Sequence, residues 1–69
     1  MPNPVICLYC TGSKESLMQA AAYLVTLRMA YYYSKDFIRV KTRVSAKVAS
    51  IERRMRELGM STRRTYERF

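Results

Sequence analysis

The 69-residue chain contains no histidine and no tryptophan, and it has only two cysteines, two glycines and two prolines. Without histidine, and with only five carboxylate side chains, it offers almost no candidates for general acid–base catalysis. A chain this short forms at most one domain and buries only about 60% of its unfolded surface. We therefore expect a single small domain over residues 1–69 that is not an enzyme and gains stability from a partner or from its own copies.

The two cysteines form a Cys7-x-x-Cys10 pair. A structural zinc ion needs four ligands, usually Cys or His, so one chain cannot complete such a site. We predict no metal site and no cofactor, and we interpret both residues as small apolar thiols. Two cysteines without a disulfide framework favour an intracellular, reducing compartment. The first residues carry no basic group, so a secretory signal is not expected.

Glycine and proline are absent between Gly12 and Gly59. This absence favours a long helix, for which Ser13 is a good N-cap and Gly59 a good C′ residue in a Schellman-type ending with Met60. A three–four repeat of twelve positions runs from Ala20 to Leu58, and ten of them are apolar or aromatic. The sequence thus predicts a mainly α protein: an extended arm (1–12), a long amphipathic helix or helical hairpin (13–58, with a break allowed near 34–36) and a basic tail (59–69).

An alternating pattern in residues 37–44 supports a second interpretation. There Ile38, Val40, Thr42 and Val44 would face a core while the basic residues between them faced outward, as in a β-strand. Ser45 could then cap a helix from Ala46 to Leu58. The alternative fold is a small α+β protein of strand, helix, strand and helix, and its two-stranded sheet would need a partner.

Charge is divided unevenly along the chain. Residues 1–33 have a net charge of +1, whereas residues 34–69 have a net charge of +7. A basic half of this kind is typical of proteins that contact nucleic acid or an anionic surface. On a helix, four basic residues spaced four apart would form a ladder for phosphates, and three more lie in the tail. These seven predicted nucleic-acid-binding residues are Lys35, Arg39, Arg43, Lys47, Arg63, Arg64 and Arg68.

The tail from Arg56 to Phe69 resembles the turn and second helix of helix-turn-helix DNA-binding domains. Residues 58–61 (Leu-Gly-Met-Ser) correspond to the turn, and the resemblance implies that Thr62, Arg63 and Arg64 contact bases or phosphates from a recognition helix. The alternative is that Gly59 ends a helix and a basic tail follows it.

Residues from Leu17 to Tyr33 are almost entirely apolar. They could form a helix buried against protein neighbours, or a short membrane span whose tyrosines lie at the interface. Exposed tyrosines could instead stack on single-stranded bases. We expect a small basic protein that binds DNA or RNA through phosphate contacts, as a homo-oligomer or within a larger nucleoprotein assembly. The alternative function is an accessory subunit of a multi-protein or membrane complex.

Overall fold

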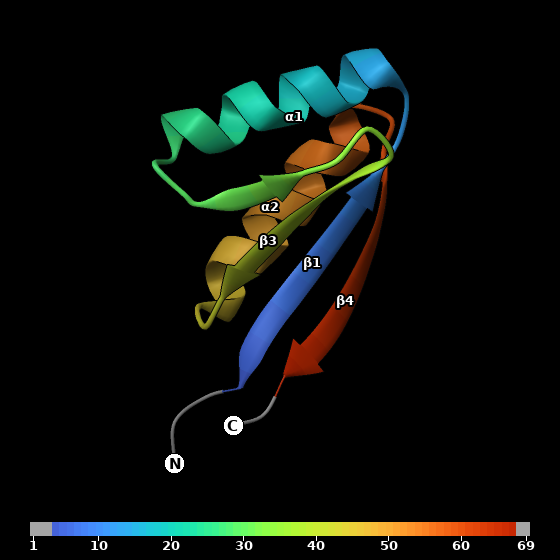
Figure 1. The fold of residues 1–69 in the computed structure, drawn as a ribbon. Coiled ribbons are helices and arrows are strands. Elements are labelled where there is room, and N and C mark those ends of the chain that lie inside the picture. The colour runs from blue at the N-terminus through green and yellow to red at the C-terminus, as the bar shows by residue number, and fades with distance from the viewer. Residues whose placement is uncertain (1–3, 68–69) are drawn as a thin grey trace.

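Strands and helices alternate in the order β-α-β-β-α-β in the computed structural model, which describes residues 4–67 (Figure 1). The elements are β1 (Val5–Thr11), α1 (Lys14–Thr26), β2 (Tyr31–Tyr33), β3 (Phe37–Thr42), α2 (Ser45–Glu57) and β4 (Ser61–Glu67). The strands form one sheet in the order β2-β3-β1-β4, and every neighbouring pair is antiparallel. This connectivity is the split β-α-β, or ferredoxin-like, arrangement.

The prediction of a mainly α protein is wrong. The range 13–58, expected to be helical, contains two separate helices and the strands β2 and β3. The range 59–69, expected to be a basic tail, contains the strand β4. The α+β alternative is closer, because it placed strands at both β1 and β3. It lacked β2 and β4, and the sheet therefore has four strands instead of two.

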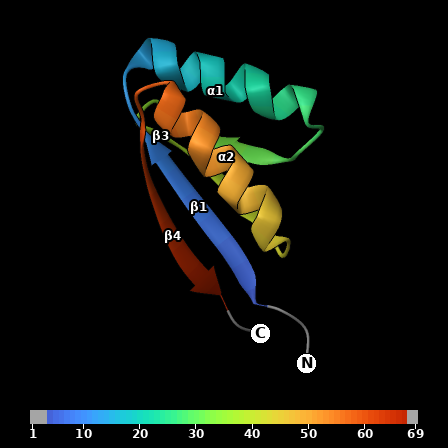
Figure 2. The same cartoon turned by 180° about the vertical axis from the view of Figure 1, so that it is seen from behind.

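Both helices cover the same face of the sheet, and the opposite face is left open (Figures 1 and 2). Alternate residues of β1 and β3 point toward the helices, because successive side chains of a strand lie on opposite faces. They form the core together with three buried residues from each helix. The core members from these elements are Ile6, Leu8, Cys10, Leu17, Ala20, Leu24, Ile38, Val40, Val48, Ile51 and Met55.

Two helix ends lie where the sequence predicted them. The Ser13 hydroxyl accepts a hydrogen bond from the backbone N–H of Ser16 (3.1 Å) and caps α1. At the end of α2, Gly59 has a φ of 80°, and the N–H of Met60 donates to the Met55 carbonyl (3.0 Å). This is the Schellman ending expected from the glycine. The predicted Ser45 cap is wrong, because α2 begins at Ser45 and Val44 precedes it without a side-chain cap bond.

The end of α1 explains why the break was expected near residues 34–36 and not at Arg28, where the helix ends. Arg28 adopts a φ of 56°, and the N–H of Met29 donates to the Leu24 carbonyl (3.2 Å) in the same Schellman pattern. A residue with a β-carbon pays about 1–2 kcal/mol for this left-handed conformation, so glycine normally marks such a position. Here an arginine occupies it, and the sequence carries no local signal for the turn.

The apolar stretch Leu17–Tyr33 is divided between α1, a turn and β2. Leu17, Ala20 and Leu24 face the protein's own core. The expected helix over the whole stretch is therefore wrong, and its burial against neighbouring proteins stays a prediction. Among residues 4–67, no helix has the length and apolar character needed to cross a membrane.

Candidate nucleic-acid interface

A row of alternating arginine and tyrosine residues crosses the open face of the sheet. Arg63 on β4 pairs with Tyr9 on β1, Tyr9 pairs with Arg39 on β3, and Arg39 pairs with Tyr32 on β2. Residues in direct register point to the same face, so all four side chains lie on the side opposite the core. The row therefore brings together residues that are up to 54 positions apart in the chain.

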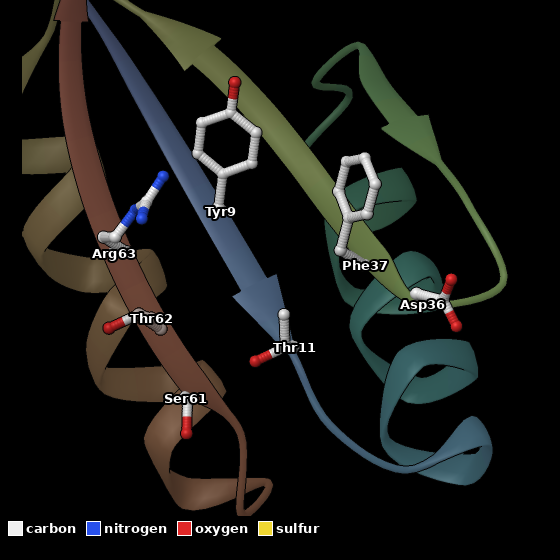
Figure 3. Close-up of a pocket in the computed structure, with 7 residues that line it drawn as sticks. All are labelled: Tyr9, Thr11, Asp36, Phe37, Ser61, Thr62 and Arg63. Atoms are coloured by element: carbon white, nitrogen blue, oxygen red, sulfur yellow. The ribbon is translucent and has the colours of Figure 1, made fainter.

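Phe37 extends this row into a cluster of three aromatic rings. Its ring centroid lies 5.9 Å from that of Tyr9, with an interplanar angle of 46°. On its other side it lies 5.7 Å from the Tyr32 centroid, with the two rings nearly parallel at 9°. Figure 3 shows Tyr9 and Phe37 projecting from adjacent strands on the face away from the helices. We name Tyr9, Tyr32 and Phe37 the aromatic cluster.

Each tyrosine of the aromatic cluster has an arginine beside it. The guanidinium carbon of Arg39 lies 5.0 Å from the Tyr32 ring centroid, and that of Arg63 lies 5.9 Å from the Tyr9 centroid. At these distances a cation is attracted by the quadrupole of the ring. The two guanidinium groups are thus held next to the rings, where they can contact a ligand that stacks on the aromatic cluster.

A shallow pocket of about 340 Å³ opens at one end of this surface (Figure 3). It lies over β1 and β4 and reaches the start of β3. Its lining residues are Tyr9, Thr11, Asp36, Phe37, Ser61, Thr62 and Arg63. These residues carry two aromatic rings, four hydroxyl groups, one carboxylate and one guanidinium, and the rings of Tyr9 and Phe37 can contact a flat ligand in the pocket.

An ion pair lies at the other end of the open face. Lys41 Nζ on β3 lies 3.2 Å from a carboxylate oxygen of Glu67 on β4, so the pair spans the intervening strand β1. Hydrogen bonds from Cys7 and Lys41 lower the pKa of Glu67. Because that pKa is depressed, the pair contributes to stability above the usual carboxylate pKa, and the contribution is lost as the pH falls.

The four basic residues that were predicted to form a ladder on one helix do not lie in a row in the structure. Its regular spacing required one continuous helix, whereas the structure places its members on a turn, a strand, a second turn and α2. Arg39 lies on the open face, Lys35 in the turn before β3, Arg43 directly after β3, and Lys47 in the first turn of α2. Only Arg39 of these four belongs to the row of arginine and tyrosine residues.

The adjacent residues Arg63 and Arg64 lie on opposite faces of β4. The resemblance to a helix-turn-helix domain had placed both on a recognition helix, and that helix is absent because residues 61–67 form a strand. Arg64 points toward α2, where its Nε donates to Glu52 Oε1 (2.8 Å). Hydrogen bonds to Glu52 and Tyr66 raise the pKa of Arg64. The remaining predicted residue, Arg68, lies outside the described residues.

Tyr9 and Phe37 were not predicted from the sequence as members of the candidate site. The signal that could have found Tyr9 is its position between two buried residues, Leu8 and Cys10, because a single large polar aromatic residue in an apolar strand faces away from the core. Tyr32 was noted only as one of several tyrosines that could stack on bases. Phe37 is one of the ten apolar or aromatic positions of the three–four repeat, so it was expected to pack in the interior of a long helix.

The two cysteines do not form a metal-binding pair. They are three residues apart on one strand and point to opposite faces, Cys10 toward the core and Cys7 toward the open face. Both are free and buried, and burial raises the pKa of Cys10 to about 11. Within residues 4–67 there is no cluster of three or more metal-ligand side chains.

Comparison with known proteins provides no family for the chain: no family model matches it, and neither a curated protein nor a solved structure matches it significantly. The residues of the open face and their geometry are therefore the basis from which a function can be inferred.

Proposed function

We propose that this protein binds single-stranded nucleic acid on the open face of its sheet. The bases stack on the aromatic cluster of Tyr9, Tyr32 and Phe37, and the phosphates contact the neighbouring arginines. The observation that carries this proposal is the row Arg63–Tyr9–Arg39–Tyr32, in which rings and cations alternate across all four strands.

The chemistry of single strands explains why this arrangement favours them. Unpaired bases expose their π-faces, and stacking on aromatic side chains contributes about 1–3 kcal/mol per base without depending strongly on sequence. RNA-recognition modules use a four-stranded sheet with aromatic residues on its face to stack two or three bases. In a duplex the bases are already stacked on each other, so the aromatic cluster would have no free base to contact.

The net charge of +8 supports the same function. Phosphates are the anions that such a charge attracts at long range, and the arginines of the open face then provide direct contacts. Arg39 and Arg63 each have one side toward a tyrosine ring, which is the arrangement that a nucleotide needs when its base stacks and its phosphate binds nearby.

Binding of a fluorescein-labelled eight-nucleotide single strand, measured by anisotropy over a salt series, tests the proposal. We expect the affinity to fall with salt, with a slope of about −1.4 in log K against log salt if Arg39 and Arg63 each contact one phosphate of a single strand. A hairpin duplex of the same length is the control and should bind more weakly. An affinity that is independent of salt, or equal for the duplex, would contradict the proposal.

The outer face of α1 supports the expectation that the protein forms an oligomer. Met18 and Val25 are 58% and 60% exposed, and no charged residue lies between Glu15 and Arg28. Two molecules with a charge of +8 repel each other over most of their surfaces, but this face is neutral and apolar. We propose that a second copy of the chain covers it.

Replacing Val25 by glutamate is expected to convert such a dimer into a monomer, because a carboxylate would be buried at the contact without a partner. Sedimentation equilibrium of the wild type and of the variant measures this change. Ala49→Glu introduces the same charge on an exposed position of α2 and serves as the control. A wild type that is monomeric at high micromolar concentration would show that α1 does not bind a second copy.

A further inference from the structure

Lys41 lies on the open face but is not among the phosphate contacts proposed above. It follows Arg39 by two positions on β3, so both side chains point to the same face. Two residues of a strand span about 7 Å, so a phosphate bound by Arg39 would lie near the Lys41 side chain. The same closeness is seen in a shallow pocket of about 250 Å³, which is lined by Tyr32, Arg39 and Lys41 among others. Lys41 is therefore placed to provide a further phosphate contact.

The ammonium group of Lys41 is engaged on the other side of β1 instead. Its Nζ atom lies 3.2 Å from Glu67 Oε1 and 3.4 Å from Oε2, at the end of the sheet where β1 begins and β4 ends (Figure 1). The Cys7 thiol, on the intervening strand β1, also hydrogen-bonds to this carboxylate. Because these hydrogen bonds lower the pKa of Glu67, the carboxylate is ionised at neutral pH and attracts the ammonium as a phosphate would.

Glu67 also has a direct effect on any phosphate that approaches this end of the face. Among the residues of the four described strands, it is the one acidic side chain. Its negative charge repels a phosphate that lies beside Arg39 and Lys41, and this repulsion adds to the loss of the ammonium. The side chains of Lys41 and Glu67 are 45% and 40% exposed, so they can be replaced without disturbing the core.

We propose that Glu67 withholds Lys41 from the nucleic acid and so limits the phosphate contacts of the open face to Arg39 and Arg63. This inference rests on the proposed binding of single strands to that face. The carboxylate acts as an internal competitor of phosphate, and its charge sets both the affinity and the salt dependence of binding.

Glu67→Gln tests the competitor directly, because it keeps the size of the side chain and removes its charge. Anisotropy titrations of a labelled single-stranded octamer over a salt series measure the result. We expect the slope of log K against log salt to steepen from about −1.4 to about −2.1, since each phosphate contact on a single strand contributes about −0.7. At about 0.1 M salt the same contact should raise the affinity about fivefold. Circular dichroism establishes that the variant is folded.

Two variants of Lys41 show whether the gain comes from its ammonium group. Lys41→Ala in the wild-type background should leave the slope at about −1.4, because Lys41 makes no phosphate contact while Glu67 holds it. The double variant Glu67→Gln/Lys41→Ala should lose the gain of the single Glu67 variant and return to the wild-type slope. Its net charge equals that of the wild type, so long-range attraction is unchanged.

Glu57→Gln is the matched control for the loss of one negative charge. Glu57 forms an exposed ion pair with Arg54 on α2 (3.5 Å), on the side of the sheet opposite the open face. The variant therefore frees one cation away from the aromatic cluster. It should leave the salt slope unaltered and change the affinity by less than about twofold, through long-range attraction alone.

The outcomes separate this inference from the function on which it rests. A steeper slope in Glu67→Gln that disappears in the double variant supports it. An unaltered slope in Glu67→Gln, or an equal gain in Glu57→Gln, would overturn it and leave the single-strand function in place. A shallower slope in Lys41→Ala would do the same, because Lys41 would then contact phosphate in the wild type. Failure of the wild type to bind the octamer would overturn both.

Discussion

Tyr9→Ala is expected to weaken the binding of a single-stranded octamer by about tenfold to a hundredfold. The tyrosine ring lies at the centre of the row of arginine and tyrosine residues, and the loss of one base–aromatic stack costs about 1–3 kcal/mol. Anisotropy titrations of the wild type and of the variant at the same salt concentration measure the change. Circular dichroism establishes that the variant remains folded.

Two further variants show whether the ring itself is responsible. Tyr9→Phe keeps the ring and removes only the hydroxyl, so it should bind within about twofold of the wild type if stacking is the dominant contribution. Tyr66→Ala removes a ring that is 58% exposed on the opposite face of β4 and should leave the affinity unaltered. An equal loss in Tyr9→Ala and Tyr66→Ala would contradict the placement of the interface on the open face.

Arg63→Ala is expected to weaken binding and Arg64→Ala to reduce stability, although the residues are neighbours in the chain. Loss of Arg63 should weaken binding about tenfold and reduce the salt slope by roughly 1, because the residue lies beside Tyr9 on the open face. Loss of Arg64 should instead lower the melting temperature, because it leaves the largely buried carboxylate of Glu52 without its partner.

The two variants control each other for the loss of positive charge. Each removes one positive charge from the molecule, so a reduction in long-range attraction of the nucleic acid affects both equally. Any difference between them in affinity therefore reports direct contact. If Arg64→Ala lost as much affinity as Arg63→Ala and kept its melting temperature, both arginines would face the ligand, and the orientation of β4 would be wrong.

The helix ends that depend on residues close together in the chain were predicted correctly. Ser13 caps α1 and Gly59 ends α2, because both features depend on backbone groups a few residues away. The alternation in residues 37–44 also indicated a strand, and Ile38 and Val40 face the core as that alternative stated. Val44, which it also placed in the core, lies beyond the end of β3 and is exposed. The absence of glycine and proline, however, was interpreted as a long helix or helical hairpin, although the chain turns at Arg28 without a glycine.

The sheet could not be predicted in this way, because its stability depends on pairs that are distant in the chain. β1 pairs with β3 and with β4, whose residues lie 26 or more positions away. Residues 61–67 contain no long apolar run that would mark a strand, since Arg63 and Arg64 occupy its centre. They form a strand because the edge of β1 supplies hydrogen bonds and Glu52 pairs with Arg64.

The sequence by itself determines that this protein is small and basic, and where its helices can be capped. Only the tertiary structure decides which basic residues share a surface with aromatic rings. A strand turns successive side chains to opposite faces, so Arg63 joins the open face while Arg64 is held against α2. Which face is open depends in turn on the two helices, which cover the side that carries Leu8, Cys10 and Val40 and leave Tyr9 and Arg39 exposed to a ligand.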